Sequence, residues 1–203
     1  TGANGETPDS IELVSNKTYY IRELVAPKGH QLSDAIKEVF LTPSTGTSTV
    51  VMAEYPDNEQ YGKINLKKNA KDASGKGQTV LNPNYSLAGA VYGVYTSAAA
   101  TTLAKDKAGN DVTLTTDANG DATTSQLLLG DYYIKEIKAS PGFLLDPTVY
   151  PVSLKTDDRT IAIVTAGQTV PEQEQYGRIE LDKQAKHASL AGETVFNPNY
   201  TLD

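Results

Sequence analysis

The sequence predicts an all-β fold built from repeated β-sandwich modules, and three observations support this prediction. The chain repeats itself, because QYGKINLKKNAK at 60–71 returns as QYGRIELDKQAK at 175–186, an offset of 115 residues. Short runs of alternating apolar and polar side chains are separated by turn residues, which is typical of antiparallel sandwiches or barrels. Twelve Tyr against 3 Phe, together with many Thr, Val and Ile, favour strands over helices.

A second pair of similar segments helps to define the module. YYIRELVAPKGHQL at 19–32 matches YYIKEIKASPGFLL at 132–145, an offset of 113 residues. The two offsets predict the C-terminal part of one module at 1–60, a complete module at 61–175 and the N-terminal part of a further module at 176–203. Arrays of like units usually act as spacers, stalks or filaments, so the repeat favours a mechanical role.

The complete module reads as a series of short strands in chain order. Ile64, Leu66 and Lys68 alternate with polar residues in the first strand. Later strands are expected within 86–97, 112–115, 127–138, 148–154 and 160–166. The last two are predicted to pair across the charged turn at 155–159. Asn119-Gly120, within the turn at 117–121, is the strongest short hairpin signal.

One local pattern disagrees with the repeat. SDAIKEVF at 33–40 could begin a capped helix. Its counterpart in the second copy, DPTVYPVS at 146–153, contains two prolines and β-branched residues. The repeat therefore predicts a strand at 35–41.

Composition excludes several classes of function. The net charge of −7 argues against a nucleic-acid groove and against binding to an anionic membrane surface. No apolar run is long enough to span a bilayer, so no membrane insertion is expected in this segment. The absence of Cys excludes disulfides and thiolate metal sites, and His30 and His187 fall at non-equivalent positions.

The turn at 117–121 also carries acidic and amide side chains. Asp117, Asn119 and Asp121 have the spacing of the first ligands of a calcium loop, but position 128, where the loop's glutamate would be, is Leu. A plain turn is the preferred interpretation, and neither a metal nor any other cofactor is expected.

Two charged residues lie in phase with the predicted core. Lys68 is in register with Ile64 and Leu66, and Glu136 is in register with Ile134. The other copies repeat both features, with Lys183 for the lysine and Glu23 for the glutamate. A buried lysine and a buried glutamate are each costly unless they meet, so Lys68 and Glu136 are predicted to be partners.

These residues resemble a known family. The inward lysine strand, LAGAVYGVY at 87–95 and above all YYIRELVAPKG at 19–29 are similar to the collagen-adhesin B-type (Cna-B, prealbumin-like) repeat domain of Gram-positive surface proteins and pilins. The resemblance covers the whole chain, and the second copy departs from it by the insertion of Ser140. It implies tandem immunoglobulin-like (prealbumin-like) Greek-key β-sandwich modules used as a stalk.

The resemblance also implies a chemical reaction. Many members of the family form a spontaneous isopeptide bond from a lysine to Asn or Asp, with a glutamate as the catalytic acid. Lys68 would be the nucleophile and Glu136 the acid, since burial favours the uncharged forms of both. The acceptor is expected on the last strand, near Glu54 in the first copy and near Gly167 in the second, yet neither position holds Asn or Asp. Two alternatives remain open: an isopeptide bond, or a buried ion pair alone.

The predicted function is that of a stalk or shaft module of a bacterial cell-surface adhesin or pilus. The protein would be anchored to the cell wall and would hold a binding tip away from it. No Ser/His/Asp set, phosphate loop or pair of catalytic carboxylates is visible, so an enzyme is not expected. The rival interpretations are an adhesive module that binds a host protein or glycan, and a spacer in a secreted multi-domain enzyme.

The expected partners are neighbouring modules of the same protein, with a host surface ligand bound by other parts of it. The preferred interpretation makes this chain an excerpt of a longer array. The alternative is that neighbouring chains complement each other end to end and form a filament.

Overall fold

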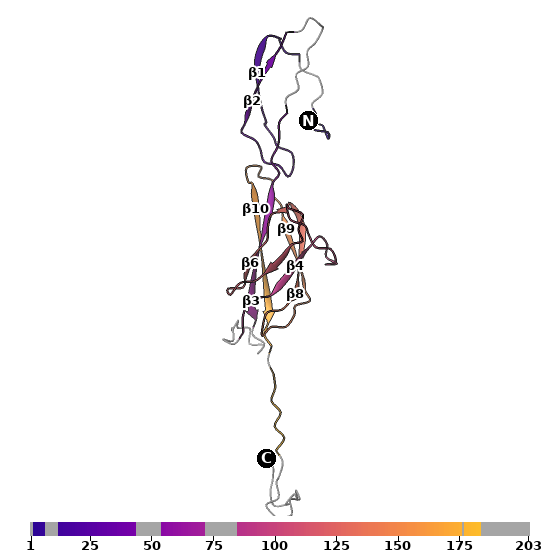
Figure 1. The fold of residues 1–203 in the computed structure, drawn as a ribbon, viewed down its shortest axis with the longest axis vertical. Coiled ribbons are helices and arrows are strands. Elements are labelled where there is room, and N and C mark those ends of the chain that lie inside the picture. The colour runs from indigo at the N-terminus through magenta and orange to yellow at the C-terminus, as the bar shows by residue number, and fades with distance from the viewer. Residues whose placement is uncertain (1, 7–11, 44–53, 72–84, 176, 184–203) are drawn as a thin grey trace, which may run out of the picture.

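The computed structural model describes residues 2–6, 12–43, 54–71, 85–175 and 177–183. In this part of the chain every regular element is a strand. The molecule is long and narrow, with a small N-terminal β unit in line with a sandwich and an extended segment that leaves the other end (Figure 1). Within the described ranges, no helix is long and apolar enough to cross a membrane.

The N-terminal unit is an antiparallel pair of strands. β1 (Lys17–Arg22) and β2 (Ile36–Leu41) are paired so that Lys17 lies opposite Leu41 and Arg22 opposite Ile36. The strand predicted at 35–41 is thus confirmed over a helix. The prolines of the second copy identified the conformation that the local sequence left ambiguous.

Within the described residues, the sandwich consists of the eight strands from β3 to β10. They are β3 (Tyr61–Lys71), β4 (Val91–Tyr95), β5 (Thr113–Thr115), β6 (Asp121–Thr123), β7 (Leu127–Leu128), β8 (Gly130–Lys138), β9 (Val149–Leu154) and β10 (Ile163–Gln173). One sheet has the order β10-β3-β6, with β7 also paired to β3, and the other has the order β5-β4-β8-β9.

The two sheets enclose one hydrophobic core, and residues from both of them fill it. Its buried members are Ile64, Leu66, Ala90, Tyr92, Val94, Ala104, Val112, Leu114, Leu127, Tyr132, Ile134, Val152, Leu154 and Val170. Packing is close where β3 crosses β9, because a Cβ on Gly62 would lie 2.6 Å from a methyl carbon of Leu154. A glycine at this position therefore lets the sheets approach each other.

The predicted hairpin of the last two strands is wrong. β9 pairs with β8, whereas β10 crosses to the other sheet and runs parallel to β3 from Ile163 opposite Tyr61 to Gln173 opposite Lys71. The sandwich is therefore not antiparallel throughout. On its other side β3 pairs with β6 over only three residues. The 11-residue β10 pairs with β3 along its whole length and satisfies the backbone groups of β3 on that side.

The Asn119-Gly120 turn is present, but it does not join a hairpin. β5 pairs with β4 in one sheet, while β6 pairs with β3 in the other, so the turn carries the chain between sheets. Gly120 has a φ of 82°, and its carbonyl accepts a 2.7 Å hydrogen bond from the Lys68 amide. The turn thus fixes the backbone of β3 beside Lys68.

The repeat is also visible in the hydrogen bonds. In both copies the amide two residues after the glycine of a Pro-Lys-Gly or Pro-Gly turn donates to a carbonyl of the C-terminal segment, and an amide of that segment donates back to the glycine. The equivalent pairs are Gln31 N to Asn58 O and Leu144 N to Gln173 O, then Gln60 N to Gly29 O and Gln175 N to Gly142 O, with lengths of 2.7–2.9 Å. These contacts align 58–60 with 173–175 at the 115-residue offset.

Gln60 connects the N-terminal unit to the sandwich. Its buried side chain donates to the carbonyl oxygens of Asp158 and Ile161 at 2.8 and 2.7 Å, and accepts from Arg159 at 3.3 Å. Next to it, the Leu32 amide donates to the Arg159 carbonyl at 2.9 Å. The joint between the two units is therefore held by specific polar contacts.

Candidate functional site: a buried lysine between two carboxylates

Lys68 lies inside the sandwich with a fully buried side chain. It comes from β3, where side chains alternate between the two faces, so the strand that buries Ile64 and Leu66 also buries Lys68. Its Nζ lies 4.4 Å from the centre of the Phe143 ring, which gives a favourable cation–π contact.

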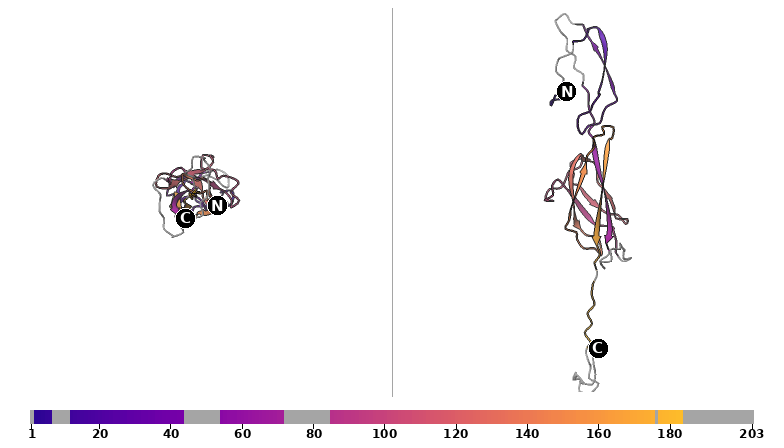
Figure 2. Two further views of the ribbon diagram at one scale, coloured as in Figure 1. Left: turned by 90° about the horizontal axis from the view of Figure 1, so that it is seen from below. Right: turned by 180° about the vertical axis from the view of Figure 1, so that it is seen from behind.

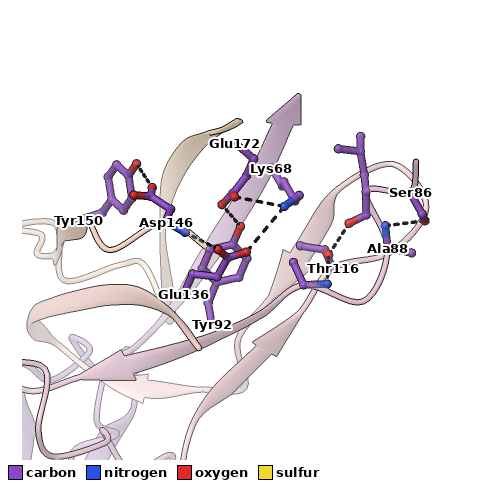
Figure 3. Close-up of polar contacts among 11 residues, drawn as sticks. Lys68, Ser86, Ala88, Tyr92, Thr116, Glu136, Asp146, Tyr150 and Glu172 are labelled. Atoms are coloured by element: carbon purple, nitrogen blue, oxygen red, sulfur yellow. Dashed lines mark hydrogen bonds and ion pairs between the residues drawn. The ribbon is translucent and has the colours of Figure 1, made fainter. Parts of the chain in front are cut away.

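Two carboxylates, from different strands, face the lysine (Figure 3). Lys68 Nζ lies 3.7 Å from Glu136 Oε1 on β8 and 3.4 Å from Glu172 Oε2 on β10, and both glutamate side chains are fully buried. The cluster therefore connects β3 and β10, the first and last strands of the module, with β8 of the opposite sheet.

The far oxygen of each carboxylate is held by a hydrogen bond. Tyr92 Oη donates to Glu172 Oε1 at 2.6 Å, and the Asp146 amide donates to Glu136 Oε2 at 2.7 Å. These bonds fix both carboxylates and leave Glu136 Oε1 and Glu172 Oε2 turned towards Lys68 (Figure 3).

The electrostatics favour an uncharged acid in this cluster. Burial raises the pKa of Glu136, more than the Asp146 amide and the Lys68 charge lower it. The pKa of Tyr92 is also raised, first by burial and then by its hydrogen bond to Glu172, so the phenol stays protonated as a donor. One lysine facing two carboxylates would carry excess negative charge if all were ionised. The raised pKa of Glu136 lets the cluster keep a proton.

The facing atoms are otherwise without hydrogen-bond partners. Within the described residues, Lys68 Nζ, Glu136 Oε1 and Glu172 Oε2 are buried polar atoms that make no hydrogen bond, although they lie within ion-pair distance. Unsatisfied buried polar groups are costly and concentrate at sites with a chemical role. The Lys68 amine thus lies beside the carboxyl group of Glu172, whose carbon it could attack, and beside the carboxyl group of Glu136, which could transfer protons.

The sequence-predicted residues divide into two groups. Lys68 and Glu136 meet in this cluster, whereas Glu23 and Glu54 lie in the N-terminal part and Lys183 lies in the exposed segment after the sandwich. Gly167 is opposite Asn65 on β3, while Val170 is opposite Lys68. The last strand of the first copy, which the repeat predicts at 49–54, lies outside the described residues except for Glu54.

Sequence reasoning missed Glu172 and Tyr92. Glu172 lies beyond the last strand predicted at 160–166, but the 115-residue offset places it on Asp57, another acid, which is a signal that could have marked it. The phenol of Tyr92 carries no comparable signal, since alternation predicts only that its ring faces the core.

The turn at 117–121 uses its acid locally. Asp117 Oδ1 accepts hydrogen bonds from the amides of Asn119 and Asp121 at 2.8 and 2.9 Å. In the described part of the chain, no three His, Cys, Asp or Glu side chains are placed to hold a metal ion.

Comparison with known proteins identifies the fold of the sandwich. Residues 81–169 match the family described as SpaA, prealbumin-like fold domain. The resemblance to prealbumin-like domains and the all-β fold class are therefore confirmed for this part of the chain. No curated protein matches the sequence.

Solved structures of a TIE protein and of pilin subunits are similar to the chain. The Bacillus anthracis TIE protein has 20% identity and a TM-score of 0.52, over 78% of this chain and 25% of that one. BcpA, the major pilin subunit of Bacillus cereus, in its D312A form, has 28% identity and a TM-score of 0.35, over 57% of this chain and 30% of that one. GBS52, the minor pilin of Streptococcus agalactiae, has 15% identity and a TM-score of 0.42, over 85% and 66%. The chain thus spans about a quarter of the TIE protein, and that likeness concerns the fold.

Proposed function

We propose that this chain is a structural segment of a pilus shaft or adhesin stalk on the surface of a Gram-positive bacterium, and that an amide bond between Lys68 and Glu172 locks its sandwich. The observation that carries the proposal is the 3.4 Å approach of Lys68 Nζ to Glu172 Oε2, with both side chains fully buried. The match of residues 81–169 to the SpaA prealbumin-like fold domain supports the role of the module.

The bond forms between Lys68 Nζ and Glu172 Cδ. The amine attacks the carboxyl carbon, the C–N bond forms, and Cδ–Oε2 breaks. Oε2 leaves as water with two protons, one from the protonated carboxyl of Glu136 and one from the amine. Glu136 Oε1, 3.7 Å from Nζ, gives its proton to the leaving oxygen, then takes the amine proton and passes it on, and ends as a carboxylate.

Tyr92 stabilises the charge that develops during this attack. Its hydroxyl already donates to Glu172 Oε1, the oxygen that becomes negative in the tetrahedral intermediate and then the amide oxygen. Because the donor is fixed before the reaction, it needs no reorganisation. Burial keeps bulk water from the cluster, so hydrolysis does not compete.

The product fits a load-bearing role. β3 and β10 are the first and last strands of the sandwich, and the bond ties Lys68 to Glu172 across them. In this proposal the surrounding modules of the same protein continue the stalk, other parts of the protein bind the host ligand, and the whole is anchored to the cell wall.

Intact mass spectrometry of the unfolded chain tests the cross-link. The mass should be lower than that of the sequence by one water, and Lys68→Arg and Glu136→Ala should restore the full mass. Glu172→Gln is the sharper variant, because a reacting amide would release ammonia in place of water. A wild-type mass equal to that of the plain sequence would contradict the bond.

The stalk role is tested separately, on cells. Antibodies raised against residues 61–175 should label surface filaments along their length on the bacterium that encodes the chain. Labelling confined to the tips would support the rival adhesive module, and labelling of secreted protein alone would support a spacer.

A further inference from the structure

We propose that Asp146 is a positioning residue for the cross-linking reaction: its side chain holds its own backbone amide on Glu136 Oε2, which leaves the transferable proton of Glu136 on Oε1, the oxygen that faces Lys68. The inference rests on the proposed cross-link and gives a role to a residue outside the reacting groups. The hydrogen bonds of the loop between β8 and β9 carry it.

Asp146 is half-buried in the loop at 139–148, at the end of the sandwich from which the chain leaves (Figures 1 and 2). Its amide donates to Glu136 Oε2 at 2.7 Å, while its Oδ1 accepts from the Thr148 amide at 2.9 Å and its Oδ2 from the Tyr150 hydroxyl at 2.6 Å (Figure 3). Burial raises the pKa of Asp146, but its hydrogen bonds lower it more, so the carboxylate stays ionised. A carboxylate held at both oxygens fixes the backbone that carries it.

The amide determines which oxygen of Glu136 carries the proton. An oxygen that accepts a strong N–H hydrogen bond is favoured as the carbonyl oxygen, so the proton of the neutral acid resides on the other oxygen. In Glu136 that other oxygen is Oε1, which lies 3.7 Å from Lys68 Nζ. The proton that the leaving water needs is therefore on the reactive side of the cluster before the amine attacks.

The charge of Asp146 supports the same result. The charged and titratable groups around Glu136 are Lys68 on β3, Tyr92 on β4, Glu172 on β10 and Asp146 itself. Burial raises the pKa of Glu136 most, and the negative charges of Glu172 and Asp146 raise it further. An ionised acid in the loop thus helps Glu136 to keep its proton.

The first copy shows that the turn alone needs no acid. At the 113-residue offset Ser33 is equivalent to Asp146, and its amide donates to Glu23 Oε2 at 2.9 Å. Ser33 Oγ accepts from the Ala35 amide at 3.3 Å, which is the counterpart of the Thr148 bond. A short side chain that accepts one amide therefore closes this turn without a charge. Serine at position 146 separates the effect of the turn from the effect of the charge.

The rate of cross-linking in newly made chain tests the proposal. A brief pulse of cell-free synthesis supplies the full chain, which is diluted into buffers of different pH and sampled over time by intact mass in acid. Asp146→Ala loses the turn and should cross-link about tenfold more slowly at every pH, while its final mass still falls by one water. Asp146→Ser keeps the turn, so its maximum rate should be close to that of wild type. Its rate should fall off at a lower pH, because without the charge Glu136 loses its proton earlier.

Asp106→Ala is the matched control. Asp106, half-buried in the turn between β4 and β5, likewise accepts from a backbone amide, that of Ala108, at 2.9 Å and from the hydroxyl of Ser125 at 3.1 Å. Its loss should leave the rate and its pH profile unchanged. Equal slowing by Asp106→Ala and Asp146→Ala, or an Asp146→Ala chain that reacts as fast as wild type, would overturn the proposal.

An NMR titration separates this inference from the cross-link itself. The carboxyl carbon of Glu136 and the amide proton of Asp146 should titrate together in the full chain, and Asp146→Ser should move their common midpoint to lower pH. Both results are expected with or without an amide bond at Lys68. A wild-type chain of full mass would refute the cross-link, whereas an Asp146 amide signal that does not follow the titration of Glu136 would refute the positioning role.

Discussion

Placing Lys68 inside the sandwich costs solvation energy, which its surroundings must offset. Before the amide bond forms, the Phe143 ring and the carboxylates of Glu136 and Glu172 do so through electrostatic contacts, while the hydrogen bond from Tyr92 to Glu172 holds the geometry. Breaking a buried ion cluster by removing one partner costs about 3–5 kcal/mol, because the remaining charge is left uncompensated. These side chains therefore depend on one another.

The raised pKa of Glu136 predicts a pH dependence of stability. The unfolded chain ionises this acid near its ordinary pKa of 4.5, whereas the native state keeps the proton to higher pH. The native state then binds more protons, so this contribution to the free energy of unfolding falls as pH rises above that value.

Urea unfolding of wild type and Glu136→Gln from about pH 4 to about pH 8 measures this effect. The free energy of unfolding of the variant should fall less over this range. The slopes of the free energy of unfolding against pH are compared, because Glu136→Gln also loses the cross-link and that loss shifts the free energy of the variant equally at every pH. Glu38→Gln, on an exposed side chain, is the control, and equal slopes for wild type and Glu136→Gln would contradict the prediction.

At the scale of residues, the sequence predicted two of the four side chains in the cluster around Lys68. Alternation placed Lys68 and Glu136 inside, since strand periodicity is local and survives without knowledge of the fold. It could not supply Glu172, because the side chain opposite a lysine depends on which strand lies beside β3 and in which register.

At the scale of elements, the turn between β5 and β6 shows what local sequence can decide. Asn-Gly fixes a tight reversal with a positive φ at Gly120, but it does not determine which sheet each flanking strand joins. The same holds for β9 and β10, where a charged turn suggested a hairpin and the chain crosses between sheets. Strand identity could be predicted, whereas strand pairing depends on tertiary contacts.

Gly120→Ala should destabilise the sandwich by roughly 3 kcal/mol. Alanine is strained at a φ of 82°, and its Cβ would also lie 2.4 Å from the Lys68 carbonyl oxygen. This oxygen belongs to the backbone and cannot move aside. Chemical unfolding checks the value.

Gly109→Ala is the matched control for this substitution. Its φ is 85°, but a Cβ there would meet nothing within 4 Å, so only the backbone cost of about 1 kcal/mol remains. Equal losses at the two positions would show that the contact with Lys68 has no effect.

At the scale of the whole molecule, Gln60 determines how firmly the N-terminal unit is held to the sandwich. Its side-chain amide is bonded at both the nitrogen and the oxygen to residues 158–161, and the equivalent residue after the sandwich is Gln175. A tandem arrangement of modules would reuse this joint at every boundary.

Gln60→Ala should loosen the joint without unfolding the sandwich. The expected result in small-angle X-ray scattering is a broader distribution of interatomic distances with a shorter maximum dimension, since the units no longer stay in line. Gln168→Ala is the control, because that amide bonds only to the neighbouring Thr169 carbonyl in the described structure. Scattering curves that coincide for all three proteins would show that the joint does not depend on Gln60.

The parallel pairing of β3 and β10 has a mechanical consequence. The chain enters the sandwich at Tyr61, the start of β3, and leaves it after Gln173, the end of β10, and the two strands run side by side for 11 residues. Tension between these points loads the strands in shear along their common axis. The backbone hydrogen bonds must then yield together, whereas in a hairpin pulled from its open end they would unzip one after another.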